Sequence, residues 1–248
     1  MSKRRETPIH KEFIEPHMCS TELRLEILRQ VPFFNGLGEA EVAKINPLFK
    51  EQGFSTGETV YFAGDSAGRM YIVADGKVKL MHHTSAGKDV MLDILKQGDF
   101  FGSLAIEGGE RYAETAIAQT DCCVLGIDSE SFRRVVQAYP PVSLKVIDIM
   151  AERLQSAQEM IRLLSAYSVE QRLAHILLIL GDKLGEEHEK GVLIQMPLSR
   201  NDLGEMVGTT TETASRVMSD FQEHGLIQSG RRWVAIVDRD RLLAKTEN

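Results

Sequence analysis

Glycine-containing pairs punctuate the first half of the chain and divide it into short segments. They recur at steps of about ten residues, a spacing that is typical of short antiparallel strands. The pairs are Gly57-Glu58, Gly64-Asp65, Asp75-Gly76, Gly87-Lys88, Gly98-Asp99 and Gly108-Gly109. Between and after them lie the strand-like runs TVYF, MYIVA, KVKLM, VMLDIL, TAIAQ and CCVLGI. The sequence therefore predicts a small β-barrel or jelly roll that closes near Ile127.

Two details of this region carry predictions of their own. Asp75-Gly76 predicts a hairpin that joins MYIVA to KVKLM, because both residues tolerate positive φ. Cys122 and Cys123 are neighbours on the last strand-like run, so their side chains should point to opposite faces of the sheet. The chain has 3 cysteines, which form neither a disulfide framework nor a paired metal array and favour buried, reduced thiols.

The hydrophobic period changes to that of a helix after Pro140-Pro141. Apolar residues then recur at alternating steps of three and four, the pattern of a two-stranded coiled coil. We call these residues the seam: Ile147, Met150, Leu154, Ala157, Ile161 and Leu164. The other faces are polar, so the seam fits one partner helix and favours a homodimer. A single long helix packed on its own barrel is the alternative.

The stretch LSRNDLGEMVGTTTETASRVM, from Leu198 to Met218, predicts two short helices bent around Val207-Gly208. Each helix has a capping-box start signal, and Gly208 lies where the turn needs a permissive residue. The two capping boxes pair Ser199 with Asp202 and Thr209 with Glu212. On the second helix an apolar face is formed by Ala214, Val217, Met218 and Phe221, and the opposite polar face by Glu212, Ser215, Arg216 and Ser219. One face can pack while the other reaches base edges.

A second DNA-directed feature follows in LIQSGRRWVAIV, from Leu226 to Val237. Two strand-like runs flank Ser229-Gly230, with Arg231 and Arg232 near the tip, where arginines suit phosphates. This pattern predicts the wing of a winged helix-turn-helix. The chain has a formal net charge of -7, and residues 197–241 contain six Arg, no Lys and seven Asp or Glu. Local placement of arginines, doubled by a dimer, must therefore supply the attraction to DNA.

Several function classes are disfavoured by what the sequence lacks. Its longest apolar run, AHILLIL from Ala174 to Leu180, falls short of the roughly 20 residues of a membrane span. MSKRRETPIHKEF has no apolar core, so it does not fit a secretory signal. We therefore expect a cytoplasmic protein with no membrane partner. An enzyme would need a nucleophile, a base and an orienting group, and no such set is visible, so we predict no catalytic residue.

The chain resembles the CRP/FNR family, the cyclic-nucleotide-receptor-like bacterial transcription factors. The match covers about Leu28 to Val237 and includes GDFFGSLAI, ERYAETAIAQ, MAERLQ and LSRNDLGEMVGTTTETASRV. The resemblance implies an α+β fold with an N-terminal cyclic-nucleotide-binding-like jelly roll, a long dimerisation helix and a C-terminal winged helix-turn-helix. It implies a homodimer that binds a palindromic operator in double-stranded DNA and works with RNA polymerase. We place a flexible tail at 1–21, the sensor domain at 22–138, the dimerisation helix at 139–168 and the DNA-binding domain at 169–248.

The resemblance also assigns residues to the DNA. Arg216 and Glu212 match an arginine and a glutamate that contact bases in the family, and Ser215 resembles the FNR branch. Thr211 stands where the cAMP receptor has another base-reading arginine. The full predicted DNA-binding set is Arg200, Thr209, Thr211, Glu212, Ser215, Arg216, Arg231 and Arg232.

The predicted ligand pocket lacks most of the residues with which cAMP-binding members of the family hold cAMP. Arg111 matches the phosphate-binding arginine, but Ser103 occupies the position of the ribose-binding glutamate. Tyr112 replaces a phosphate-binding serine or threonine, and Ala157 and Gln158 replace the adenine partners. The candidate pocket comprises Gly102, Ser103, Leu104, Arg111, Tyr112, Ala157 and Gln158. We therefore expect DNA binding without cAMP.

Other forms of regulation stay open at this stage. A cyclic nucleotide or another small anionic ligand at Arg111 is one alternative. A structural Arg111 paired with Glu107, Glu110 or Glu114 is another. An iron-sulfur cluster generally needs four cysteine thiolates, and Cys19 alone remains at the N-terminus, so we expect no cluster, metal or other cofactor. A regulatory subunit of an enzyme or channel is disfavoured by the winged helix.

Overall fold

The computed structural model describes residues 21–84, 87–103 and 110–247. They form two compact units, residues 21–157 and residues 158–247, and the division falls inside one long helix. The first unit begins with α1 (Thr21–Gln30), η1 (Pro32–Phe34), α2 (Glu39–Ile45) and η2 (Asn46–Leu48). After its strands come α3 (Ser129–Ala138) and α4 (Pro140–Ala166), which runs on into the second unit.

The strands of the first unit form two antiparallel sheets. One has the order β1-β8-β3-β6 and the other the order β2-β7-β4-β5. The strands are β1 (Lys50–Phe54), β2 (Thr59–Tyr61), β3 (Arg69–Asp75), β4 (Val78–His83), β5 (Asp89–Leu95), β6 (Phe100–Gly102), β7 (Thr115–Ala118) and β8 (Cys122–Asp128). Each of the six strand-like runs is a strand, which confirms the jelly roll. The described strands stay in two separate sheets rather than closing into a barrel. The polar β1 and the short β6 had no alternating pattern to predict them.

The predicted hairpin at Asp75-Gly76 is wrong. Gly76 does have a positive φ of 74°, but β3 and β4 belong to different sheets, so the turn carries the chain from one sheet to the other. A Cβ at Gly76 would lie 2.2 Å from the Asp121 carbonyl oxygen. Glycine is therefore required by both the backbone angle and the close approach of Asp121 and Cys122, at the start of β8. The hairpin in that sheet is β4 with β5.

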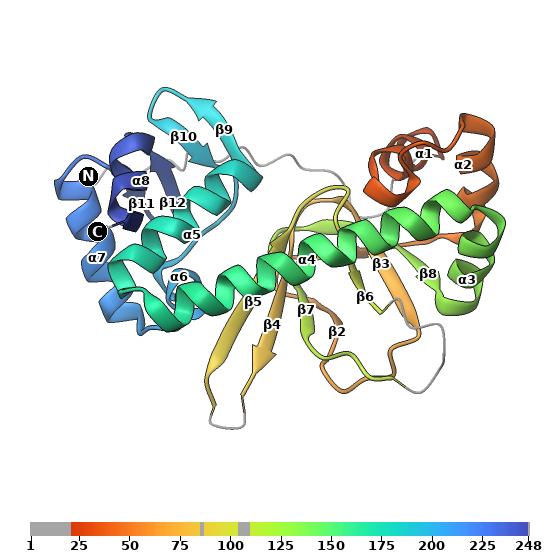
Figure 1. The fold of residues 1–248 in the computed structure, drawn as a ribbon, viewed down its shortest axis with the longest axis horizontal. Coiled ribbons are helices and arrows are strands. Elements are labelled where there is room, and N and C mark those ends of the chain that lie inside the picture. The colour runs from red at the N-terminus through yellow and green to blue at the C-terminus, as the bar shows by residue number, and fades with distance from the viewer. Residues whose placement is uncertain (1–20, 85–86, 104–109, 248) are drawn as a thin grey trace. The chain divides into compact units, whose positions relative to one another are not determined.

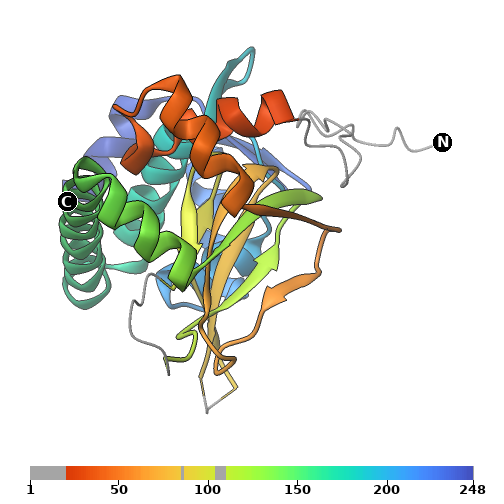
Figure 2. The same cartoon turned by 90° about the vertical axis from the view of Figure 1, so that its right-hand side faces the viewer.

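Two apolar clusters form the core of this unit. The first lies where α1, η1, α2 and α3 cover one side of β3 and β8, with Phe33 and Leu125 near its centre. Figure 1 shows these helices gathered at one end of the sheet, and the view at right angles agrees (Figure 2). The second cluster, around Tyr61, lies between the two sheets. Cys123 belongs to the first cluster and Cys122 to the second, which confirms that they point to opposite faces.

Helix α4 has two apolar faces with different environments. Val142 is buried, and Val146 and Ile149 pack against the first cluster. The seam faces elsewhere, and Leu154 is 62% exposed. Its other large members, Ile147, Met150, Ile161 and Leu164, are exposed as well. The alternative prediction, in which the seam packs on the chain's own sheets, is therefore wrong, because the described residues leave the seam exposed.

The second unit is a small α/β domain around one four-stranded sheet, of order β11-β12-β10-β9. Its elements are α5 (Val169–Leu184), β9 (Gly185–His188), β10 (Gly191–Ile194), α6 (Arg200–Val207), α7 (Thr211–Glu223), β11 (Ile227–Gly230), β12 (Trp233–Ile236) and α8 (Arg239–Glu247). Ser168 begins α5 with a capping box. The winged helix-turn-helix prediction is confirmed, while β9, β10 and α8 were not predicted from the sequence.

Candidate nucleic-acid interface and sensor site

The turn between α6 and α7 follows the predicted chemistry at its first cap. The Ser199 N–H donates to Asp202 Oδ2 at 2.7 Å, and the Asp202 N–H donates back to Ser199 Oγ at 3.1 Å. Helix α6 ends at Gly208, which adopts the left-handed conformation with φ 64°. The first capping box and the role of Gly208 are both confirmed.

The second cap lies one residue later than predicted. Thr210, not Thr209, begins α7, and its Oγ1 accepts from the Thr213 N–H at 3.2 Å. The Thr209 N–H donates to the Gly204 carbonyl at 2.9 Å, so this residue still closes the turn of α6. The pairing of Thr209 with Glu212 is therefore wrong, because a sequence spacing cannot reveal which threonine has left the preceding helix.

Helix α7 separates a packing face from an exposed face, as predicted. Ala214, Met218 and Phe221 are fully buried, whereas Glu212 and Arg216 are exposed. The polar face is completed by Ser215, which is half-buried, and Ser219, which is exposed. Within the described part of the chain, neither Glu212 nor Arg216 forms an ion pair or a side-chain hydrogen bond. Both side chains are therefore free to bind an external partner.

The hairpin of β11 and β12, which we call the wing, turns at a different point from the predicted one. Gly230 pairs with Trp233, so Ser229 and Gly230 lie in β11 and the turn is made by Arg231 and Arg232. Both arginines are exposed, and Arg232 has a positive φ of 64°. That angle is uncommon for a side-chain-bearing residue. This tight turn places the guanidinium groups of Arg231 and Arg232 at the tip of the wing.

The predicted DNA-binding residues at the start of α6 and α7 have protein partners. The half-buried Arg200 donates from Nη2 to Ser229 Oγ at 2.6 Å, and burial lowers the pKa of its guanidinium. Thr211 is exposed, and its hydroxyl donates to Asn201 Oδ1 at 2.9 Å. Thr209 is half-buried. The exposed members of the predicted set are therefore Thr211, Glu212, Arg216, Arg231 and Arg232, all on α7 or the wing.

In the sensor unit, Arg111 is exposed and bonded to the backbone. Its Nη1 donates to the Gly64 carbonyl at 2.5 Å. Glu114 accepts from the Tyr61 hydroxyl at 2.8 Å, and among the described residues Arg111 forms no ion pair with either Glu110 or Glu114. Leu104 and Glu107 lie outside the described residues. Gly102 ends β6, and the N–H of the half-buried Ser103 donates to the Arg69 carbonyl at 3.0 Å.

Tyr112 turns into the core between the sheets. Its hydroxyl donates to the Arg69 carbonyl at 3.0 Å, and its ring stacks 3.7 Å from that of Tyr61. Tyr71 and Phe101 extend the stack. Burial raises the pKa of both Tyr61 and Tyr112, and the Glu114 carboxylate adds to the rise at Tyr61. Two further predicted pocket residues, Ala157 and Gln158, are exposed on α4.

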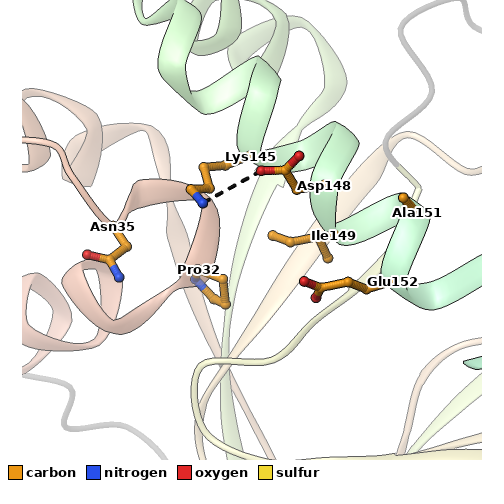
Figure 3. A pocket seen from close by; sticks show the side chains of 7 residues that line it. All are labelled: Pro32, Asn35, Lys145, Asp148, Ile149, Ala151 and Glu152. Carbon is orange, nitrogen blue, oxygen red and sulfur yellow. Dashed lines mark ion pairs between the residues drawn. The ribbon is translucent and has the colours of Figure 1, made fainter. Parts of the chain in front are cut away.

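A groove of about 390 Å³ opens elsewhere on this unit, between η1 and α4 (Figure 3). It is lined by Pro32, Asn35, Lys145, Asp148, Ile149, Ala151 and Glu152. Lys145 Nζ lies 3.6 Å from Asp148 Oδ2 across one side of it. Of the residues predicted for the ligand pocket, none that the structure describes lines this groove.

Arg153 links α4 to β6, although the sequence pattern places it only on a polar face of the helix. From α4 its Nη2 donates to the Phe100 carbonyl at 2.6 Å, and its guanidinium lies 3.9 Å from the centre of the Phe100 ring. Burial lowers the pKa of Arg153, and the nearby carboxylates of Asp93 and Asp99 oppose that effect. No spacing along the chain could have paired a residue of α4 with β6.

Neither a metal site nor a membrane-spanning helix is present among residues 21–84, 87–103 and 110–247. They contain no group of three or more His, Cys, Asp or Glu side chains that could hold a metal ion. Among the helices of the same residues, none is long and apolar enough to cross a membrane.

Comparison with known proteins matches both units. Residues 51–139 match the cyclic nucleotide-binding domain, and residues 171–245 match the Crp-like helix-turn-helix domain. The cyclic AMP receptor protein of Thermus thermophilus is 30% identical over 201 residues, which cover 80% of this chain and 89% of that protein. The cAMP-activated global transcriptional regulator CRP of Salmonella typhimurium is 30% identical over 181 residues, which cover 72% of this chain and 85% of that protein.

A solved structure extends the agreement from sequence to fold. FixK2 from Bradyrhizobium japonicum has a TM-score of 0.71 and 26% sequence identity, covering 79% of this chain and 96% of that one. The order of the matched domains is the order of the two units found here. The chain therefore belongs to the CRP/FNR family of transcription regulators, with a cyclic nucleotide-binding domain followed by a Crp-like helix-turn-helix DNA-binding domain.

Proposed function

We propose that the protein binds a palindromic operator in double-stranded DNA, with α7 in the major groove and the wing on the phosphates. The observation that carries this proposal is a pair of exposed side chains on α7, Glu212 and Arg216, which have no side-chain partner among the described residues. Arg216 can donate two hydrogen bonds to guanine O6 and N7, and Glu212 can accept one from cytosine N4. The guanidinium groups of Arg231 and Arg232 can bind the DNA phosphates, although the domain as a whole is not basic.

The operator is bound by a homodimer joined along α4. The seam presents five large apolar side chains to solvent in the single chain, a larger exposed stripe than a helix in a monomer usually carries. A second copy of the same helix would cover it by two-fold symmetry. Two-fold symmetry in turn requires half-sites about one helical turn, roughly 34 Å, apart.

This activity needs no cAMP. Two relatives carry cAMP in their names, but Ser103 cannot supply the charge of a carboxylate that holds a ribose hydroxyl. Tyr112, at the position of a phosphate-binding hydroxyl, directs its own hydroxyl to a backbone carbonyl. The exposed Arg111 guanidinium favours the one alternative worth testing, a different small anionic ligand. The protein has no enzymatic activity of its own, and acts with RNA polymerase in the cytoplasm.

The test combines binding-site selection with ligand titration. Purified protein selected against a random DNA library should enrich an inverted repeat, and its affinity for that repeat should not change when cAMP or cGMP is added. Calorimetric titration with each nucleotide should give no heat of tight binding. A rise in operator affinity that saturates with either nucleotide would refute the cAMP-independent proposal, and loss of that response in Arg111→Ala would identify the anchor.

A further inference from the structure

Three side chains from three elements of the second unit form one hydrogen-bonded chain. Arg200, at the start of α6, donates from Nη2 to Ser229 Oγ at 2.6 Å. Ser229, in β11 of the wing, donates from Oγ to Gln222 Oε1 at 2.7 Å. Gln222 lies in the last turn of α7. We call this arrangement the Arg200 relay.

The chemistry of each group fixes the direction of the relay. A guanidinium can only donate, a hydroxyl can accept and donate at once, and an amide oxygen accepts. Ser229 therefore uses its single hydrogen on Gln222 and a lone pair on Arg200. Arg200 is half-buried, and no carboxylate of the described residues forms an ion pair with it. The hydroxyl is thus the partner that offsets the cost of removing part of this cation from water.

A second link joins the same two segments at the tip of the wing. The Leu198 N–H donates to the Arg232 carbonyl at 3.1 Å. Leu198 and Arg200 flank the cap of α6, so the start of this helix is tied to β11 and to the turn of the wing. The wing is thereby connected to α7 through one polar path that runs over Ser229.

We infer that Arg200 is a positioning residue, which holds the wing in register with α7 and does not serve mainly as a phosphate contact. This inference rests on the proposed DNA-binding function and refines it. The role of Arg200 is to let the wing arginines reach the DNA phosphates while Arg216 lies in the major groove. Pre-ordering these two elements lowers the entropy lost on binding.

The first test needs no DNA and uses the natural fluorescence of the wing. The chain has 1 tryptophan, Trp233, whose indole packs directly over Gly230 beside Ser229. In the free protein, Ser229→Ala and Arg200→Ala should both increase acrylamide quenching of Trp233, and the double variant should equal the single ones. Gln222→Glu, which keeps the acceptor, should quench like wild type. Arg216→Ala, on the exposed face of α7, is the matched control and should not change quenching.

The second test measures affinity for the selected operator as a function of salt. Ser229→Ala removes no charge, yet it should weaken binding about tenfold, equivalent to about 1.4 kcal/mol, with an unchanged salt slope. Arg200→Ala should weaken binding to a similar degree. A phosphate contact would instead reduce the slope by about 0.9 for each arginine. Thermal unfolding of each variant confirms that it is folded.

The outcomes separate the two proposals. Wild-type quenching and affinity in Ser229→Ala, with a reduced salt slope in Arg200→Ala, would overturn the positioning role and restore a phosphate contact. If no DNA fragment binds at all, the proposed function fails, while the quenching series still reports whether the relay holds the wing.

Discussion

The substitution Leu154→Glu tests the central mechanical feature of the proposal, the self-association of α4. Leu154 lies in the middle of the seam and is 62% exposed in the single chain. Full burial of a leucine side chain is worth about 1.5–3 kcal/mol, so covering the exposed part should contribute about 1–2 kcal/mol for each protomer. Two-fold symmetry doubles this to about 2–4 kcal/mol for the dimer.

The substitution should therefore weaken the dimer by roughly 30- to 700-fold, at about 1.4 kcal/mol for each factor of ten. That figure is a lower bound, because two carboxylates would also face each other in the interface and would be partly desolvated. Sedimentation velocity over a concentration series should show monomers where the wild type shows dimers. Lowering the pH toward the pKa of the introduced carboxyl should restore part of the association.

Leu243→Glu is a matched control, since Leu243 is a comparably exposed leucine on another helix, α8. It should leave the dimer intact. If Leu154→Glu and Ile161→Glu both sedimented as unchanged dimers, the seam would not be the interface, and the two-fold operator geometry would lose its structural basis.

Three further predictions concern the DNA interface and the fold. Arg216→Ala should cost about 1–3 kcal/mol of specific binding and relax base preference at one position in each half-site. Arg232→Ala should instead weaken binding to all sequences alike. If both variants kept wild-type affinity across a site library, the assignment of α7 to the groove would be wrong. Gly76→Ala should lower the melting temperature well beyond Gly57→Ala, because both have positive φ but only Gly76 faces a backbone oxygen; equal losses would argue against the close approach. Hydrogen bonds from Ser131 lower the pKa of Asp128, the N-cap of α3. The stability that this cap contributes is therefore present above the ordinary carboxyl pKa and is lost as pH falls through the lowered value. In urea unfolding, Asp128→Ala should cost about 1 kcal/mol at neutral pH and little in acid, and a loss of stability independent of pH would contradict the role of the cap.

Much of this molecule follows from patterns along the chain alone. The glycine pairs, the short apolar runs between them such as MYIVA, the capping box at Ser199 and the left-handed Gly208 depend on residues a few positions apart. These local rules hold whatever the rest of the chain does, so the strands, the two helices and the free face of α7 could be predicted. The seam could be predicted for the same reason, because its period is a property of one helix.

The tertiary structure decided which distant groups meet. Asp75-Gly76 predicted a turn correctly, but pairing depends on which strands lie beside β3 and β4, and those come from elsewhere in the chain. Tyr112 lies at a ligand position by sequence, yet its hydroxyl donates to the carbonyl of Arg69, 43 residues away. Arg200 similarly belongs to the DNA-binding set predicted from the sequence, yet it is directed to Ser229, 29 residues away. A long polar side chain goes to whichever partner best offsets its desolvation, and that partner exists only once the chain has folded.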